Sequence, residues 1–240
     1  MKILKNIFLF FILSGIGISS CKKDKPVDES INFGYNYFPD DVGRYVIYEV
    51  DSIWQDDPED IHDTARYLVM EKISEHFTDN SGRPTLRIER YFKYYNPAVS
   101  YDSMNWSVPR IWTANKTNTT LERKEENITY IKLIFPVREG KHWNGNTYNT
   151  LGDKEYEIVS ADVPMTINNL YFDSVATVDQ YLDSNLVFYE VEKEKYARNV
   201  GLIYKKFDKL SFQQHDQFDN IPFDDTVGYR YVQKIISYGK

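Results

Sequence analysis

The 240-residue sequence is poor in the residue types that build many common functional sites. It holds one cysteine, so no intrachain disulfide can form, and its 4 histidines lack the spacing of metal ligands. Phosphate-binding loops, dinucleotide fingerprints and the Gly-x-Ser-x-Gly motif of hydrolases are missing. The chain carries 29 basic against 36 acidic residues, which argues against nucleic acid as a partner. These absences predict a protein that is not an enzyme and needs no cofactor or metal.

The longest apolar run lies near the N-terminus and is too short to cross a membrane. It extends from Ile7 to Leu13 after Lys2 and Lys5, whereas a spanning helix needs about 20 apolar residues. This pattern is typical of a secretory signal. Cys21 follows directly on Ile18-Ser19-Ser20, which resembles the lipobox of bacterial lipoproteins, in which the cysteine sulfur is diacylated and becomes the first mature residue. Ordinary signal cleavage that leaves a free thiol is the alternative.

This resemblance divides the chain into three parts. Residues 1–20 are predicted to be a lipoprotein signal peptide, residues 21–33 an acylated cysteine with a flexible tether, and residues 34–240 one β-rich domain. Acyl chains contribute about 0.8 kcal/mol per buried methylene, so a lipidated Cys21 implies a membrane as partner. The charged run "KKDKPVDES" after Cys21 also resembles surface-export signals of Bacteroidota lipoproteins. We therefore expect an outer-membrane lipoprotein of the cell envelope, either periplasmic or surface-exposed.

Composition and alternation favour β structure. The chain has 20 Tyr and 14 Phe, and aromatic residues favour strands. In "TLRIERYFKYY" every second residue from Leu86 is mostly apolar, as in a strand with one wet face. Such segments are Tyr45 to Ile53, Ala65 to Phe77, Thr85 to Tyr95, Thr119 to Lys124, Ile128 to Phe135, Lys154 to Ser160, Leu170 to Val178, Leu186 to Val191, Leu202 to Leu210 and Val227 to Tyr238. About ten strands predict an all-β fold with one antiparallel, strongly curved sheet that forms an open barrel or a sandwich.

Two segments are less clear. The charges of "EVEKEKYAR", Glu190 to Arg198, are good helix formers, but no capping residue precedes the segment and Val187, Tyr189 and Val191 alternate into it, so we predict a strand. In "NWSVPRIW", Pro109 separates two apolar groups, and a proline inside a run belongs at an edge, a bulge or a loop. We predict that this segment lies there.

One short motif occurs twice. Phe38-Pro39-x-x-x-Gly43 returns as Phe135-Pro136-x-x-x-Gly140. Proline lacks a backbone donor and ends pairing, whereas glycine permits a tight turn with positive φ. The motif contains no positioned nucleophile or base, so it predicts a strand-entry corner used twice. The two copies could mark an old duplication of half-barrels or one local solution found twice.

Three longer segments carry a family resemblance. "YFPDDVGRYVIYEVDSI", "FPVREGKHWNGN" and "NVGLIYKK" resemble segments of a group of uncharacterised Bacteroidota outer-membrane lipoproteins, whose opening is typically Tyr-Phe-Pro-x-x-x-Gly-x-x-Trp-x-Tyr. Here Val46 stands at the tryptophan position. The Val-Gly-Leu hairpin also resembles that of open, LolA-like β-barrels. The resemblance implies a lipid-anchored β domain and carries over no catalytic residue.

Three classes of function fit this sequence. The first is a non-catalytic binding or structural module that holds an apolar ligand or an envelope protein partner. The second is a surface glycan-binding protein that uses exposed aromatic rings, with Trp106, Trp112 and Trp143 as candidates. The third, a hydrolase, would require clustered carboxylates, or a histidine with a nucleophile, in one cleft.

Two acid-rich stretches could supply oxygen ligands for calcium. They are "DDPEDIHD", Asp56 to Asp63, and "HDQFDNIPFDD", His215 to Asp225. Neither has the regular alternation of a calcium-binding loop, and solvated acidic loops are commoner. We therefore predict no metal site in either stretch.

Overall fold

The computed structural model describes residues 32–212 and 226–240. Cys21 and the predicted signal peptide lie outside the described residues. The strands are β1 (Tyr45–Asp56), β2 (Ile61–Thr78), β3 (Pro84–Tyr94), β4 (Arg110–Lys116), β5 (Thr120–Glu125), β6 (Ile128–Ile134), β7 (Lys141–Asn144), β8 (Glu155–Ile167), β9 (Leu170–Ser184), β10 (Phe188–Ala197), β11 (Gly201–Phe212) and β12 (Thr226–Gly239). Three short 3-10 helices are η1 (Tyr35–Tyr37), η2 (Asp57–Glu59) and η3 (Tyr101–Ser103).

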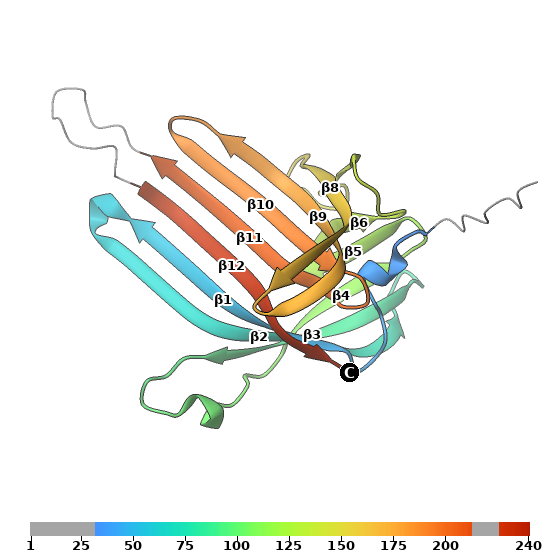
Figure 1. Ribbon diagram of the computed structural model, residues 1–240, viewed down its shortest axis with the longest axis horizontal. Helices are drawn as coiled ribbons and strands as arrows, with labels where there is room; N and C mark the ends of the chain where they lie inside the picture. Colours follow the sequence, from blue (N-terminus) through green and yellow to red (C-terminus); the bar gives the residue numbers. More distant parts are fainter. Residues whose placement is uncertain (1–31, 213–225) are drawn as a thin grey trace, which may run out of the picture. The chain divides into compact units, whose positions relative to one another are not determined.

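All the strands belong to one 12-stranded sheet with the order β6-β5-β4-β3-β2-β1-β12-β11-β10-β9-β8-β7. Two antiparallel meanders, β1–β6 and β7–β12, are therefore joined where β1 pairs with β12. Figure 1 shows the sheet curling on itself. This arrangement confirms the predicted all-β fold with one strongly curved antiparallel sheet, which nearly closes into a barrel.

The two edge strands, β6 and β7, meet at the seam of the barrel. The backbone N–H of Ile131 donates to the carbonyl of Gly145 at 2.9 Å. The indole Nε1 of Trp143 donates to the Ile131 carbonyl at 2.8 Å, and the Asn149 amide donates to the Thr129 carbonyl at 2.9 Å. At the seam, a few hydrogen bonds between residues 143–149 and β6 thus replace the full ladder of a strand pair.

Most strands lie where alternation predicts them, including β10 over the lysine- and glutamate-rich segment. Two strands differ from the prediction. Arg110–Lys116 forms β4, which lies inside the sheet between β3 and β5, so placing all of "NWSVPRIW" at an edge or in a loop was wrong. The physical reason is that Pro109 directly precedes the strand and so costs it no hydrogen bond. The four-residue β7 is too short to show a period.

One end of the barrel is closed by the chain itself. In this sheet, neighbouring strands run in opposite directions, so every connection that follows an even-numbered strand lies at the same end. Phe33, Tyr35 and Asn36 reach three of these connections. The Phe33 carbonyl accepts from Val137 N–H at 3.0 Å, the Tyr35 hydroxyl donates to the Asn118 carbonyl at 3.1 Å, and the Asn36 carbonyl accepts from Asn199 N–H at 2.7 Å. We call this the capped end.

An apolar cluster fills the barrel next to the capped end. Its buried members include Tyr37 and Phe38 from the crossing segment, with Leu121 and Leu133 from β5 and β6. The opposite end, formed by the connections that follow odd-numbered strands, includes residues 57–60, 95–109, 126–127, 145–154 and 185–187. We call it the open end.

Both copies of the repeated motif end in the same glycine corner, although Phe135-Pro136 is a cis peptide bond and Phe38-Pro39 is not. Gly43 and Gly140 have φ of 92° and 75°, in the left-handed region. The Gly43 N–H donates to the Ile73 carbonyl and the Gly140 N–H to the Ile158 carbonyl, each at 2.8 Å. Each glycine therefore binds the second strand of its meander just before the first strand begins. The motif is a strand-entry corner, as its composition predicts, and it starts each half of the barrel.

Candidate functional site

A cavity of about 660 Å³ lies in the lumen of the barrel. Its lining includes Glu126 and residues of the 145–154 connection, so the cavity reaches the open end. Seven basic side chains line it: Arg90, Arg110, Arg123, Lys132, Lys154, Lys205 and Lys206. Six carboxylates join them: Glu71, Glu125, Glu126, Asp153, Glu190 and Glu192. The aromatic members are Tyr67, Phe92, Trp112, Tyr130, Tyr156, Tyr181, Phe207 and Tyr231. The lumen therefore combines paired charges with aromatic walls.

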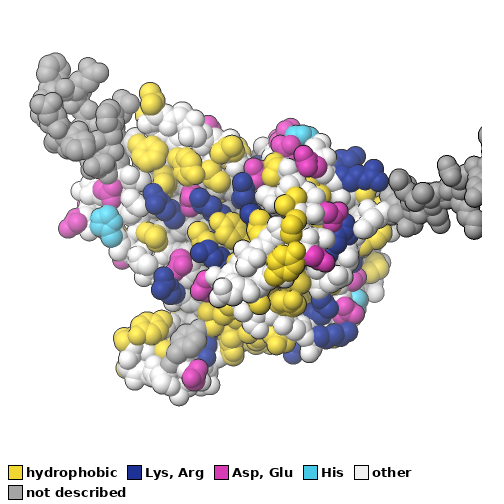
Figure 2. Space-filling model, in the orientation of Figure 1, with side chains coloured by type: hydrophobic (Ala, Val, Ile, Leu, Met, Phe, Trp, Pro, Cys, Tyr) yellow, Lys and Arg dark blue, Asp and Glu magenta, His cyan; other side chains and the backbone are white. Residues whose placement is uncertain are grey.

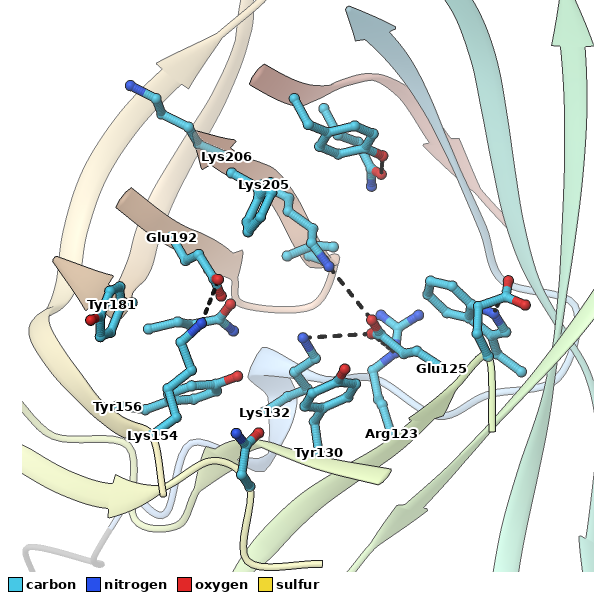
Figure 3. A pocket seen from close by; sticks show the side chains of 18 of the residues that line it. Arg123, Glu125, Tyr130, Lys132, Lys154, Tyr156, Tyr181, Glu192, Lys205 and Lys206 are labelled. Atoms are coloured by element: carbon cyan, nitrogen blue, oxygen red, sulfur yellow. Dashed lines mark hydrogen bonds and ion pairs between the residues drawn. The ribbon is translucent and has the colours of Figure 1, made fainter. Parts of the chain in front are cut away.

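Four charged side chains form a closed ring of ion pairs across the lumen. Lys132 Nζ lies 3.0 Å from Glu194 Oε1 and 3.7 Å from Glu125 Oε1. Lys205 Nζ lies 3.5 Å from Glu125 Oε2 and 3.3 Å from Glu194 Oε1. We call these four residues the charge quartet; Figure 3 shows the contacts of Glu125 with both lysines. The quartet joins β5 and β6 to β10 and β11 through the interior.

The quartet fixes the charge state of its own carboxylates. Burial alone would raise the pKa of Glu125, but Lys132 and Lys205 outweigh it and hold that pKa well below its ordinary range. The same balance between burial and the two lysines lowers the pKa of Glu194. Burial would lower the pKa of each lysine, and the carboxylates raise it instead. All four groups are therefore charged at neutral pH.

A second network extends the charges towards β2–β4. Glu71 forms ion pairs with Arg90 and Arg123, with N–O distances of 2.9 and 3.1 Å, and accepts a hydrogen bond from Arg123. Arg123 Nε also lies 3.4 Å from Glu125 Oε1, which links this network to the quartet. The Arg90 guanidinium lies 3.6 Å from the ring centroid of Trp112, as in a cation–π contact. The cavity also touches the apolar cluster directly, because Trp112, Tyr156 and Leu202 belong to both.

The remaining basic residues of the lining also have carboxylate partners. Lys154 contacts Glu192 and lies 3.6 Å from Glu190. Arg110 lies 3.9 Å from Glu126, and Lys206 lies 2.9 Å from Asp208. In Figure 2, basic and acidic side chains are likewise interspersed on the face in view. Every basic group of the cavity thus has a carboxylate within 4.0 Å.

Two buried amides in the lining have a donor without an acceptor. Gln180 on β9 is 3% exposed and Gln233 on β12 is 1% exposed. Among the described residues, no acceptor meets Nε2 of either side chain. Gln233 Oε1 accepts from the Tyr231 hydroxyl at 2.6 Å, so its amide nitrogen is the free group. An unpaired buried donor is costly. Both side chains belong to the cavity lining, but the two nitrogens themselves have less than 1 Å² of accessible surface.

The three tryptophans predicted as candidate site residues lie in different places. Trp112 lines the cavity, where Arg90 covers its ring. Trp143 belongs to the seam and packs edge-on against Tyr156, with 5.7 Å between ring centroids. Trp106 lies in the connection between β3 and β4. The structure therefore does not bring them together as one stacking platform.

Of the two acidic stretches, Asp56 to Asp63 lies within the described residues. Asp57 lies 3.6 Å from His62 and accepts the Thr226 N–H at 2.7 Å. Across residues 32–212 and 226–240, no group of three or more potential ligands could hold a metal ion. The stretch from His215 to Asp225 lies outside the described residues, as does Cys21. Residues 32–212 and 226–240 contain no helix long and apolar enough to span a membrane.

Comparison with known proteins adds little. No protein-family model matches the chain, and no curated protein matches it. Among solved structures, the crystal structure of a candidate lipoprotein from Parabacteroides distasonis ATCC 8503 is similar, with a TM-score of 0.34 and 13% sequence identity over 85% of this chain and 99% of that chain. A likeness at this level carries no argument about the fold or function of the present protein.

Proposed function

We propose that this protein is a lipid-anchored lipoprotein of the cell envelope that binds a small polar ligand in the lumen of its barrel, without catalysis. The observation that carries the proposal is the cavity of about 660 Å³, whose walls combine paired charges with aromatic rings. Ligand sites commonly have volumes of roughly 300–1,000 Å³ and a few well-placed polar groups.

The charges of the lumen favour a polar guest over the apolar guest expected from the sequence. An apolar chain in the lumen would strip water from the partly exposed lysines of the lining, Lys154, Lys205 and Lys206, and offer them no hydrogen bonds. Taking polar groups out of water without new partners costs several kcal/mol, about 1–3 kcal/mol for each neutral group and more for each charge. A polar guest avoids that cost because it can hydrogen-bond to the same walls.

The charge states favour binding over catalysis. A general acid must be protonated at the working pH, and its pKa therefore has to lie near neutrality. Burial would raise the pKa of Glu125 and of Glu194, but the lysines of the quartet outweigh this effect and lower both pKa values. Both carboxylates therefore stay ionised. Neither can donate a proton at neutral pH.

The membrane attachment rests on the sequence. The apolar run from Ile7 to Leu13 and the lipobox-like Ile18-Ser19-Ser20-Cys21 support a diacylated cysteine as the anchor. The first described residues, Asn32 and Phe33, leave a charged stretch of about ten residues after Cys21 as the tether. We place the protein on the outer membrane, facing either the periplasm or the outside.

Native mass spectrometry of the full-length protein, purified from its own envelope in mild detergent, tests the ligand proposal. We expect a discrete non-covalent adduct that denaturation removes, and we expect the double variant Gln180→Leu/Gln233→Leu to lose it. Gln55→Leu is the matched control, because Gln55 lies on β1 outside the cavity lining. A wild-type protein without an adduct, or an adduct retained by the double variant, would contradict the proposal.

A further inference from the structure

If the lumen binds a polar ligand as proposed, its chemistry can be narrowed. We infer that the ligand is a small aromatic anion, whose anionic group lies beside Lys205 and whose ring packs on aromatic side chains between the cavity and the open end. Two features of the lumen carry this inference: a surplus of buried positive charge, and a row of rings on one side of the sheet.

The buried ion-pair network of the lumen has one more cation than anion. N–O contacts within 4.0 Å join its members, which are the cations Arg90, Arg123, Lys132 and Lys205 and the anions Glu71, Glu125 and Glu194. The network as a whole therefore carries one uncompensated positive charge. A buried charge without a counterion is costly, so an anionic ligand gains more in this cavity than a neutral or cationic one.

Lys205 is the most accessible member of this network. Its side chain is 25% exposed, whereas each of the other six is 11% exposed or less. An ammonium group has three donors and Lys205 contacts two carboxylates, so a further acceptor can bind it without displacing either. The two exposed carboxylates of the lining lie elsewhere: Glu126 is 3.9 Å from Arg110, and Asp153 belongs to the connection that follows β7.

A row of aromatic rings leads from the cavity towards the open end. We call it the aromatic wall; its members are Trp54 on β1, Tyr67 on β2, Tyr94 on β3, Phe207 on β11, and Tyr229 and Tyr231 on β12. Directly opposed residues of paired strands share one side of a sheet, and Trp54 opposes Tyr229, Tyr67 opposes Tyr94, and Phe207 opposes Tyr231. Tyr67, Phe207 and Tyr231 also line the cavity, so the shared side is that of the lumen.

The rings of the wall contact one another and keep part of their surface open. Ring centroids lie 5.2 Å apart for Tyr67 and Tyr94 and 5.9 Å apart for Phe207 and Tyr229. All six rings are half-buried or exposed, and rings prefer offset or edge-on contacts with other rings at such distances. Lys205 is two residues from Phe207 on β11, so both side chains lie on the same side of the strand. A ring on the wall can thus carry an anionic group that reaches Lys205.

A panel of matched probes tests this inference with the full-length protein in detergent micelles, with empty micelles as the blank. The probes are naphthoate, its neutral analogue naphthylmethanol, the cation naphthylmethylammonium, and decanoate, which has the carboxylate without the ring. We expect naphthoate to bind most tightly in calorimetric titrations. Its advantage over naphthylmethanol should be roughly tenfold or more, the effect of one hydrogen bond to a charged group.

Two kinds of variant test the ring and the anion separately. Trp54→Ala and Tyr94→Ala should each weaken naphthoate binding by roughly threefold to tenfold, because each removes an exposed ring of the wall. Tyr171→Ala is the matched control, since Tyr171 is an exposed tyrosine on β9 outside the cavity lining. Lys205→Met should abolish the preference for naphthoate over naphthylmethanol, and an unchanged affinity for naphthylmethanol shows that this variant is folded.

The outcomes separate this inference from the proposed function. Tighter binding of naphthylmethanol or naphthylmethylammonium would overturn the anion, as would a preference retained by Lys205→Met. Unchanged binding in both wall variants would overturn the ring. A native adduct that tandem mass spectrometry identifies as a polar molecule without an aromatic ring would also overturn the inference and leave the proposed function in place. If decanoate binds most tightly, or if neither an adduct nor any probe binds, both fail.

Discussion

Lys205 and Glu125 contact each other across the interior of the barrel, with 3.5 Å between Nζ and Oε2. Their strands, β11 and β5, are separated by β12, β1, β2, β3 and β4 in the sheet. No neighbouring-strand pairing can bring these residues together, so the contact exists only because the sheet curls. The ion pair therefore forms only when the barrel closes, and both of its residues line the cavity.

Breaking the quartet should destabilise the fold. Glu125→Leu leaves Lys132 and Lys205 with one carboxylate between them, Glu194. Removing one partner from a buried ion pair costs about 3–5 kcal/mol, so we expect a loss near the lower end of that range in urea unfolding. Asp51→Asn is the control, because it breaks the exposed pair with Arg66 and should hardly move the midpoint. Equal effects of the two variants would contradict a structural role for the quartet.

The quartet also predicts how stability changes in acid. Burial would raise the pKa of Glu125 and of Glu194, but the charges of Lys132 and Lys205 outweigh it. Both pKa values therefore lie below the unfolded value of about 4.3. The stabilisation is therefore complete above about pH 4.3 and is lost as the pH falls through the folded pKa values. Denaturant titrations below pH 4.3 should show a steeper loss for the wild type than for Glu125→Leu. Parallel curves would contradict the assignment.

The lysines of the quartet predict a second loss in base. Burial would lower the pKa of Lys132 and of Lys205, but the neighbouring carboxylates outweigh it. Both pKa values therefore lie above the unfolded value of about 10.4. Their contribution is complete below that pH and is lost as the pH rises through the folded values. Lys205→Met should flatten the stability profile above pH 10.4. A variant profile as steep as that of the wild type would show that Lys205 is not held in its charged form by the fold.

The unpaired amides predict a variant that is more stable but binds less. Gln180→Leu removes a buried donor that has no acceptor among the described residues. Since an unpaired buried polar group costs about 1–3 kcal/mol, the free energy of unfolding of the ligand-free protein should rise by about 1 kcal/mol. Gln55→Leu should show no such gain. A clear destabilisation by Gln180→Leu would mean that the amide serves the fold rather than a ligand.

The repeated corner predicts matched effects in both halves of the barrel. Gly140→Ala places a side chain at φ 75° where no atom lies within 4 Å of the added Cβ, so its cost comes from the backbone alone. Left-handed conformations cost other residues about 1–2 kcal/mol, and Gly43→Ala should cost a similar amount. Gly140→Asn should cost less, because asparagine tolerates this region better. Thermal unfolding of the three variants checks the order, and a harmless Gly140→Ala would contradict it.

Much of the sheet is predictable because most strands have a clear period of two. In β3, Leu86, Ile88 and Phe92 alternate with polar residues and are all buried. The strands that the sequence does not predict are the short β7 and β4, which directly follows Pro109. Neither feature changes the curled sheet that alternation and strand number indicate.

The site is much harder to predict because its polar face looks like an ordinary wet face. Glu190, Glu192 and Glu194 alternate along β10, which normally indicates a strand surface in contact with solvent. Only closure of the barrel turns that face inwards and brings Glu194 to Lys132 on β6. Gln180 carries no local signal at all, since its burial depends on strands far away in the sequence. Of the three candidate tryptophans, Trp112 and Trp143 pack with the apolar cluster.

A crystal structure of the full-length protein, purified from its own envelope without added ligand, tests the central claim most directly. We predict continuous density in the lumen that is not water, in contact with the aromatic and charged side chains that line the cavity. Density for an acyl chain in the lumen, or water alone there in a structure at high resolution, would contradict the account.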